Sequence, residues 1–405
     1  MYEAQHRCLN RAALAQALHD SRQRTLALFD AYEQALGPAL SVPQRPELNP
    51  PLWELGHVGW FADWWIARNP LRALGLQANP DVARLPARQA AHGVDADALY
   101  HSSQVAHDRR WHLPLPDAHR TRADLADSLA ETQALLAQAD DNDDSLYFFR
   151  LALFHEDMHA EAAVYMAQTL GLDPQDKLHT NGVLAAKPPR IPQSLAVPAS
   201  EVTLGHQGAG FAFDNELGPH HVAVPAFDID RHVVSWAQFL PFVDSGAYAQ
   251  SRFWTADGLA WRQAQGAQWP RHLRPGREGW AEQRWGQWQA LDLQAPARHL
   301  SFFEAQAWCA WADRRLPTEA EWLAASQQPG FAWGQVWEWT ASAFSPFPGF
   351  SPHPYRDYSQ PWFDDRPVLK GASTATHPRM RHRQYRNYFT PDRNDLFCGF
   401  RSVQR

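Results

Sequence analysis

Three histidines have the spacing of a metal site. His155 and His159 stand four residues apart in the segment His-Glu-Asp-Met-His, inside an apolar run that favours a helix. Side chains four apart share one face of a helix, about 6 Å apart along its axis. His57 lies in an earlier helix-like segment, from which an antiparallel neighbour would bring a third imidazole to the pair. Three neutral imidazoles leave coordination positions open, which is typical of a catalytic metal ion and not of a structural one.

The imidazoles alone do not choose the metal, because they suit Fe(II), Zn(II) and Cu(II) equally. Three acidic neighbours, Glu54, Asp157 and Glu161, are candidates for orienting the N–H groups of the ligands. A purely structural or solvated role is the alternative for each of these carboxylates.

The first half of the chain has the apolar periodicity of helices. We predict helices over residues 12–36, 52–68, 122–139 and 146–170, with one long connection over about 70–118. Asp143-Asp144-Ser145 is the expected cap of the last helix and Gly171 its expected end. Four long helices predict a four-helix bundle, whose inward side chains commonly build metal sites.

The second half has a different texture, rich in Gly, Pro and Trp, with short strand-like runs such as 221–224. Only two helices are predicted there, one after Ser235 and one from Ser301 through Ala312. We therefore expect an α+β protein with a helical domain over 1–180, a proline-rich linker over 181–197 and a loop-dominated domain over 198–405.

Composition narrows the function classes for the 405 residues. The net charge of −7 disfavours a nucleic-acid partner, because phosphate binding needs a basic field. No apolar stretch near 18 residues and no signal peptide are present, so we expect a cytoplasmic protein without a membrane partner, either monomer or homodimer. The three cysteines are too widely spaced for a disulfide framework or a cysteine-type zinc site.

Several phrases of the second half resemble the formylglycine-generating enzymes, whose fold is related to C-type lectins. They are FDNE at 213–216, HLSF at 299–302, RLPTEAEW at 315–322, VWEWT at 336–340 and GFR at 399–401. The first half resembles the DinB-like bundle. In this order, the two halves together resemble the ergothioneine-pathway sulfoxide synthases and the related selenoneine synthases. These are non-haem iron enzymes that use O2 to join a sulfur or selenium donor to the imidazole C2 of hercynine.

The resemblance implies Fe(II) held by His57, His155 and His159. It also places the hercynine-binding asparagine at Asn387, in the phrase YRNYF at 385–389. A trimethylammonium group offers no hydrogen-bond donor, so its recognition depends on cation–π contact with aromatic rings. The expected substrate-pocket residues that follow are Tyr388, Phe389, Trp337 and Trp339, with Arg393 for the donor. Fold packing is the alternative role for the two tryptophans.

Two departures from the family pattern bear on the donor. Met158 stands where sulfoxide synthases have a glutamine, and Phe344 stands near the position of a catalytic tyrosine. Phenylalanine cannot donate a proton, so Tyr355 or Tyr358 is the expected replacement. The departures favour a selenosugar donor over γ-glutamylcysteine or cysteine.

Three rival functions come from other classes, and the first of them is disfavoured. A formylglycine-generating oxidase needs two close cysteines, and the corresponding stretch 370–380 contains none. A zinc-dependent thiol transferase of the DinB type would hold zinc on the same histidines. A non-catalytic binding module would use the bundle only as a scaffold.

Overall fold

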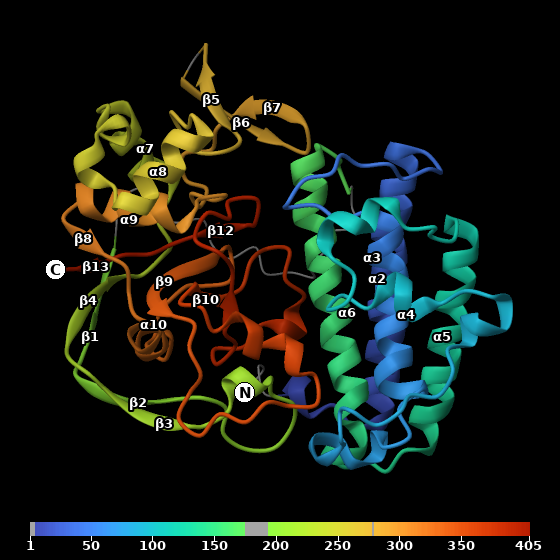
Figure 1. Ribbon diagram of the computed structural model, residues 1–405. Helices are drawn as coiled ribbons and strands as arrows, with labels where there is room; N and C mark the ends of the chain where they lie inside the picture. Colours follow the sequence, from blue (N-terminus) through green and yellow to red (C-terminus); the bar gives the residue numbers. More distant parts are fainter. Residues whose placement is uncertain (1–4, 175–192, 278) are drawn as a thin grey trace. The chain divides into compact units, whose positions relative to one another are not determined.

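The computed structural model describes residues 5–174, 193–277 and 279–405 (Figure 1). These residues form two units. The first contains the described residues before 180 together with Gly208–Phe211 and His353–Asp357. The second contains the remaining described residues of the second half. None of the helices within the described ranges is long and apolar enough to cross a membrane.

Four long helices dominate the first unit and lie side by side (Figure 1). The helices of this unit are α2 (Arg11–Leu36), α3 (Pro51–Ala62), α4 (Ala96–Tyr100), α5 (Ala118–Gln138) and α6 (Asp143–Leu170). Helix α3 packs against both α5 and α6, and α2 packs against α6. The predicted four-helix bundle is confirmed.

The helix ends follow from local capping. Asn142 caps α6 by accepting a hydrogen bond from the backbone N–H of Ser145, so the predicted cap at residues 143–145 is wrong by one position. Gly171 ends α6 in the left-handed conformation with a φ of 74°, as predicted. Helix α5 begins four residues earlier than predicted because Asp117 caps it. Beyond Ala62, α3 continues as a π-helical turn over Asp63–Ala67.

A buried ion pair joins α2 to α6 next to the histidine pair. Arg22 donates to both carboxylate oxygens of Glu156 at 2.8 and 3.2 Å. Ser21 donates to Asp157 Oδ1 at 3.0 Å. Because both acidic residues bond to α2, they fix the rotation of α6 and thereby the direction in which His155 points.

Among its described residues, the second unit is built from short strands and four α-helices, with short 3-10 helices between them. Its helices are α7 (Trp236–Asp244), α8 (Ala256–Gln265), α9 (Phe302–Trp311) and α10 (Glu319–Ser326). Its strands are β1 (Ser194–Val197), β2 (Ser200–Leu204), β3 (His220–Val224), β4 (Phe227–Asp230), β5 (Leu273–Gly276), β6 (Gly279–Arg284), β7 (Gln287–Ala290), β8 (Arg314–Arg315), β9 (Trp337–Ala343), β10 (Pro367–Gly371), β11 (Asn387–Tyr388), β12 (Cys398–Gly399) and β13 (Val403–Gln404). The predicted α+β class is confirmed.

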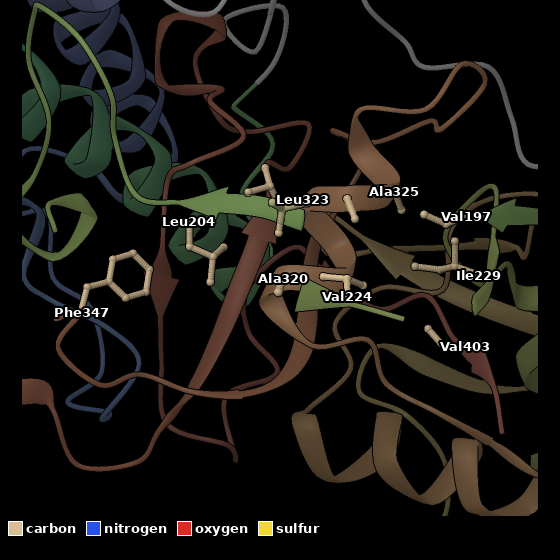
Figure 2. Close-up of a cluster of buried hydrophobic side chains, with 11 residues drawn as sticks. Val197, Leu204, Val224, Ile229, Ala320, Leu323, Ala325, Phe347 and Val403 are labelled. Carbon is tan, nitrogen blue, oxygen red and sulfur yellow. The ribbon is translucent and has the colours of Figure 1, made fainter. Parts of the chain in front are cut away.

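The strands form two four-stranded sheets, in the orders β1-β4-β13-β8 and β11-β10-β9-β12, a two-stranded ribbon β2-β3 and a three-stranded sheet β5-β6-β7. Helix α10 packs against β2, β3, β9 and β10. Figure 2 shows the apolar cluster that results, in which Leu323 of α10 lies among valine and isoleucine side chains of the strands. Burial of these apolar side chains is the main force that holds the strands and α10 together.

Two predictions about the second half need correction. Helices α7 and α9 begin after Ser235 and Ser301 as predicted, but α8 and α10 were missed. Strand β1 occupies Ser194–Val197, which falls inside the predicted linker. The rest of that linker, from 181 to 192, lies outside the described residues.

Candidate metal centre

The three predicted histidines converge inside the first unit. His57 comes from α3, and His155 and His159 come from neighbouring turns of α6. One ligand atom of each residue lies within 4.8 Å of those of the other two. The Nε2 atoms of His57 and His155 are 3.3 Å apart.

Two of the imidazoles are anchored through their outer nitrogen. His57 Nδ1 lies 2.8 Å from the carbonyl oxygen of Tyr100, which can only accept, so Nδ1 carries the proton and Nε2 keeps its lone pair. His159 Nδ1 lies 2.5 Å from a carboxylate oxygen of Glu54. The predicted orienting role is therefore observed for Glu54, whereas Asp157 bonds to α2 instead. Such outer partners fix ring orientation and raise ligand basicity.

Burial disfavours the protonated form of two of the three histidines. It lowers the pKa of His57 to about 3 and lowers the pKa of His155 well below its ordinary value. Burial alone would raise the pKa of the Glu54 carboxyl, but attraction to His159 and their hydrogen bond outweigh it, and the pKa is lowered. The site therefore combines two buried imidazoles that resist protonation, His57 and His155, with a carboxylate that favours its ionised form.

These residues fit a metal ion. Three imidazoles whose ring nitrogens converge form a donor set that binds first-row divalent metals, and the buried Glu54 carboxylate would offset part of the ion's charge. His155 Nδ1 is buried and has no hydrogen-bond partner among the described residues. The ring of His155 is instead held by Phe61, which stacks on it with centroids 3.4 Å apart and planes 4° from parallel.

The carbonyl of Tyr100 was not foreseen from the sequence, and Gly56 makes its approach possible. A Cβ atom at Gly56 would lie 2.3 Å from carbon atoms of the Tyr100 ring. Only glycine therefore lets α4 pack close enough to α3 for its last residue to accept the His57 hydrogen bond. The sequence feature that could have indicated this contact is Gly56, directly before the candidate ligand His57.

A cavity of about 230 Å³ lies within the first unit, and two of its lining residues, Trp60 and Phe61, stack on His57 and His155. Its aromatic lining consists of Trp60, Phe61, Trp64, Trp65 and Tyr355. Two polar pairs lie at the same cavity: Arg356 with Asp81, at 3.2 Å, and Ser103 with Asp357. The first unit thus offers a small chamber with aromatic and polar walls, connected to the imidazoles through the rings of Trp60 and Phe61.

The two candidate proton donors belong to different units. Tyr355 belongs to the first unit, where its ring contacts Phe61 and His155 with centroid distances of 5.0 and 6.4 Å. Tyr358 belongs to the second unit, where its hydroxyl lies 3.0 Å from that of Tyr385. Met158 is half-buried on α6 directly before His159.

The predicted hercynine residues lie in the second unit. Asn387 pairs with Leu369 of β10, and its side-chain oxygen accepts from the backbone N–H of Tyr388 at 3.0 Å. The Tyr388 hydroxyl donates to the carbonyl of Tyr358, and its ring stacks on Phe344 at 3.9 Å. Phe344 is fully buried.

The remaining predicted residues of this unit already have partners. Trp339 is fully buried and donates to the Leu300 carbonyl, and Trp337 is 3% exposed. Arg393 forms a two-pronged ion pair with Asp395 at 2.6 and 2.7 Å and stacks over Phe389.

Comparison with known proteins covers nearly the whole chain. Residues 180–334 and 331–405 match the sulfatase-modifying factor enzyme 1-like domain. A hercynine oxygenase of Mycolicibacterium smegmatis is 31% identical, with 96% of this chain and 98% of the relative covered. A hercynine oxygenase of Mycobacterium tuberculosis is also 31% identical, over 96% of this chain and 97% of the relative. A formylglycine-generating enzyme of Streptomyces coelicolor is 25% identical over 54% of this chain and 90% of the relative. With two relatives above 30% identity over almost their full length and a three-histidine cluster in the helical unit, this chain belongs to the hercynine oxygenase family.

Proposed function

We propose that this protein is a non-haem iron(II) enzyme that uses O2 to join a chalcogen donor to the imidazole C2 of hercynine, with a selenosugar as the donor. The observation that carries the proposal is the convergence of three imidazoles, two of which stack on Trp60 and Phe61 of an aromatic-walled cavity, in a chain of the hercynine oxygenase family. Iron(II) bound to His57, His155 and His159 would supply a place where O2 and the donor atom meet and the means to transfer electrons between them.

The electron balance of the proposed reaction is closed by O2. Joining a C–H and a Se–H group into a C–Se bond removes two protons and two electrons. O2 accepts four electrons when one of its atoms leaves as water and the other is added to selenium as a selenoxide. The same balance holds for sulfur and a sulfoxide, so the chemistry itself does not select the donor.

The protein's part is to hold the reactants in a dry, ordered site. Phe61 and Trp60 cover the His155 and His57 rings and keep bulk water from them. Proton delivery is proposed for Tyr355, because its ring contacts His155 within the same unit. Asn387, Tyr388 and Phe389 are proposed to recognise hercynine.

The cavity supports a sugar donor. Trp64 and Trp65 each have the Arg84 guanidinium 5.0 Å from the ring centroid, and this positive charge disfavours a second cation such as a trimethylammonium group. An uncharged sugar ring can instead stack on aromatic walls while its hydroxyls bond to the Asp81 and Asp357 carboxylates. Phe344 and Met158 stand where sulfur-using relatives were expected to have a tyrosine and a glutamine, and this difference agrees with an altered donor.

The test is a donor panel. Purified protein is reconstituted with Fe(II) under anaerobic conditions and then given O2, hercynine and one donor at a time: selenoglucose, thioglucose, γ-glutamylcysteine or cysteine. We expect mass spectrometry to show a hercynine–selenium adduct from selenoglucose. An adduct only from γ-glutamylcysteine or cysteine would instead establish a sulfoxide synthase. Absence of every adduct, with one tightly held zinc, would favour a thiol transferase.

A further inference from the structure

One arginine in the long connection between α3 and α5 is linked, through other side chains, to two of the three imidazoles. Arg110 lies in the 3-10 helix His107–His112 and is half-buried. Its Nη1 donates to the side-chain oxygen of Asn49 at 2.9 Å. Asn49 in turn donates from Nδ2 to one carboxylate oxygen of Glu54 at 2.6 Å. The other oxygen of Glu54 bonds to His159.

A second branch runs from the same guanidinium to His57. The central carbon of Arg110 lies 3.8 Å from the centre of the Trp53 ring. Trp53 stacks on His57 with centroids 4.7 Å apart and planes 9° from parallel. The indole cannot slide freely, because its Nε1 donates to the carbonyl of Leu99 at 2.8 Å. Arg110, Trp53 and His57 therefore form an ordered stack.

We propose that Arg110 is a positioning residue for the metal centre, which holds His57 through Trp53 and His159 through Asn49 and Glu54. The inference rests on the metal site of the proposed function. A planar guanidinium can place its face on an indole and its edge on an amide at the same time, which an alkylammonium cannot do. Asn49 connects the two charged side chains, because its side-chain oxygen accepts from Arg110 and its nitrogen donates to Glu54. The result is that one side chain restricts two ligands on different helices.

The restriction has a measurable consequence for metal binding. Outer partners of metal-ligating histidines typically change metal affinity by about 10- to 100-fold when they are removed. Since Arg110 supports two ligands, Arg110→Ala is expected to weaken Co(II) or Fe(II) binding by about that factor. Arg110→Lys retains a donor for Asn49 but cannot stack flat, so it should restore only part of the affinity.

The experiment titrates the full-length protein with Co(II), whose visible absorption reports ligand geometry, and repeats the titration with Fe(II) under anaerobic conditions. Arg109→Ala is the matched control, because Arg109 is the neighbouring residue of the same type and is exposed. Thermal unfolding is recorded for each variant. We expect Arg110→Ala to shift the Co(II) spectrum and weaken binding, while Arg109→Ala leaves both unchanged.

Variants along each branch separate positioning from general stability. Asn49→Ala should weaken metal binding in wild-type protein and have a smaller effect in the Arg110→Ala background, because both act through one chain of contacts. Trp53→Phe should retain most affinity, whereas Trp53→Leu should not. If Arg110→Ala does not fold, Arg110→Lys and Asn49→Ala carry the same test.

The outcomes distinguish this inference from the proposed function. Wild-type protein that binds metal, with Arg110 and Asn49 variants that match it in affinity and spectrum, would overturn the positioning role and leave the proposed function standing. Wild-type protein that binds neither Co(II) nor Fe(II) would overturn both.

Discussion

Replacement of Gly56 by alanine tests how the His57 ligand is oriented. The new Cβ would lie 2.3 Å from the Tyr100 ring, whereas ordinary van der Waals contact is 3.4–4 Å. The ring or helix α4 must therefore move by about 1 Å or more, in keeping with the dense packing of protein interiors. The Tyr100 carbonyl, now 2.8 Å from His57 Nδ1, would then leave the range of a hydrogen bond.

Two opposing terms set the effect of this substitution on stability. Overpacking of a core destabilises by about 1–3 kcal/mol. Alanine is better than glycine inside a helix by about 1 kcal/mol, which offsets part of that loss. Loss of the outer hydrogen bond adds a separate effect, a metal affinity about 10- to 100-fold weaker.

Gly59→Ala, one turn further along α3, is the matched control. Its Cβ would meet the end of the Leu125 side chain at 3.0 Å, which a rotation of that leucine can relieve. Urea unfolding and Co(II) titration of both variants separate stability from metal binding. We expect Gly56→Ala to be less stable than Gly59→Ala by about 1–3 kcal/mol and to bind Co(II) more weakly. Wild-type Co(II) affinity in Gly56→Ala would refute the role assigned to the Tyr100 carbonyl.

Three further predictions probe the fold and the site. Arg22→Ala should lower the free energy of unfolding in urea by about 3–5 kcal/mol, because it leaves the Glu156 carboxylate buried and unpaired. A change below about 1 kcal/mol would contradict the stabilising role of the ion pair. Burial raises the pKa of Glu304 to about 7 from an ordinary 4.5, so the folded protein keeps a proton that the unfolded chain releases, and wild-type stability should fall as the pH rises from about 4.5 to 7. Between pH 5 and 8, Glu304→Gln should remove about 2–3 kcal/mol of this pH-dependent loss of stability, measured by urea unfolding at each pH. An unchanged pH profile would exclude a raised pKa of Glu304 as its cause. Tyr355→Phe should reduce the rate of adduct formation by about 100-fold or more. Tyr358→Phe should retain most activity, because Tyr358 belongs to the other unit. The reverse order of activities would assign proton donation to Tyr358 instead of Tyr355.

Local sequence signals predicted much of the helical unit. The apolar spacing of residues 12–36 and 146–170 gave helices close to their observed bounds, because strong periodicity and a glycine stop agree there. The spacing of His155 and His159 placed both imidazoles on one face of α6 for the same reason. Helix α10 was missed although Thr318 and Glu321 form a capping box, a signal that is visible in the sequence.

Contacts between distant segments were not predictable in this way. Nothing near Asn49 or Arg110 in the sequence shows that they meet, since 61 residues separate them. The Tyr100 carbonyl is a backbone group, and every residue carries one, so its role depends entirely on the packing of α4 against α3. For Arg393 and Trp339, residue type suggested ligand contacts, and the sequence does not show that Arg393 pairs with Asp395 or that Trp339 donates to the Leu300 carbonyl.

The most direct test of the central claim is the iron content of three single variants. His57→Ala, His155→Ala and His159→Ala are reconstituted with Fe(II) under anaerobic conditions beside the wild type and His19→Ala, a control at an exposed position of α2. Bound iron is then quantified after gel filtration, with circular dichroism as the check of folding. We expect about one iron per chain in the wild type and the control, and almost none in the three folded variants. One equivalent of iron in folded His159→Ala would contradict the claim that these three imidazoles form the metal centre.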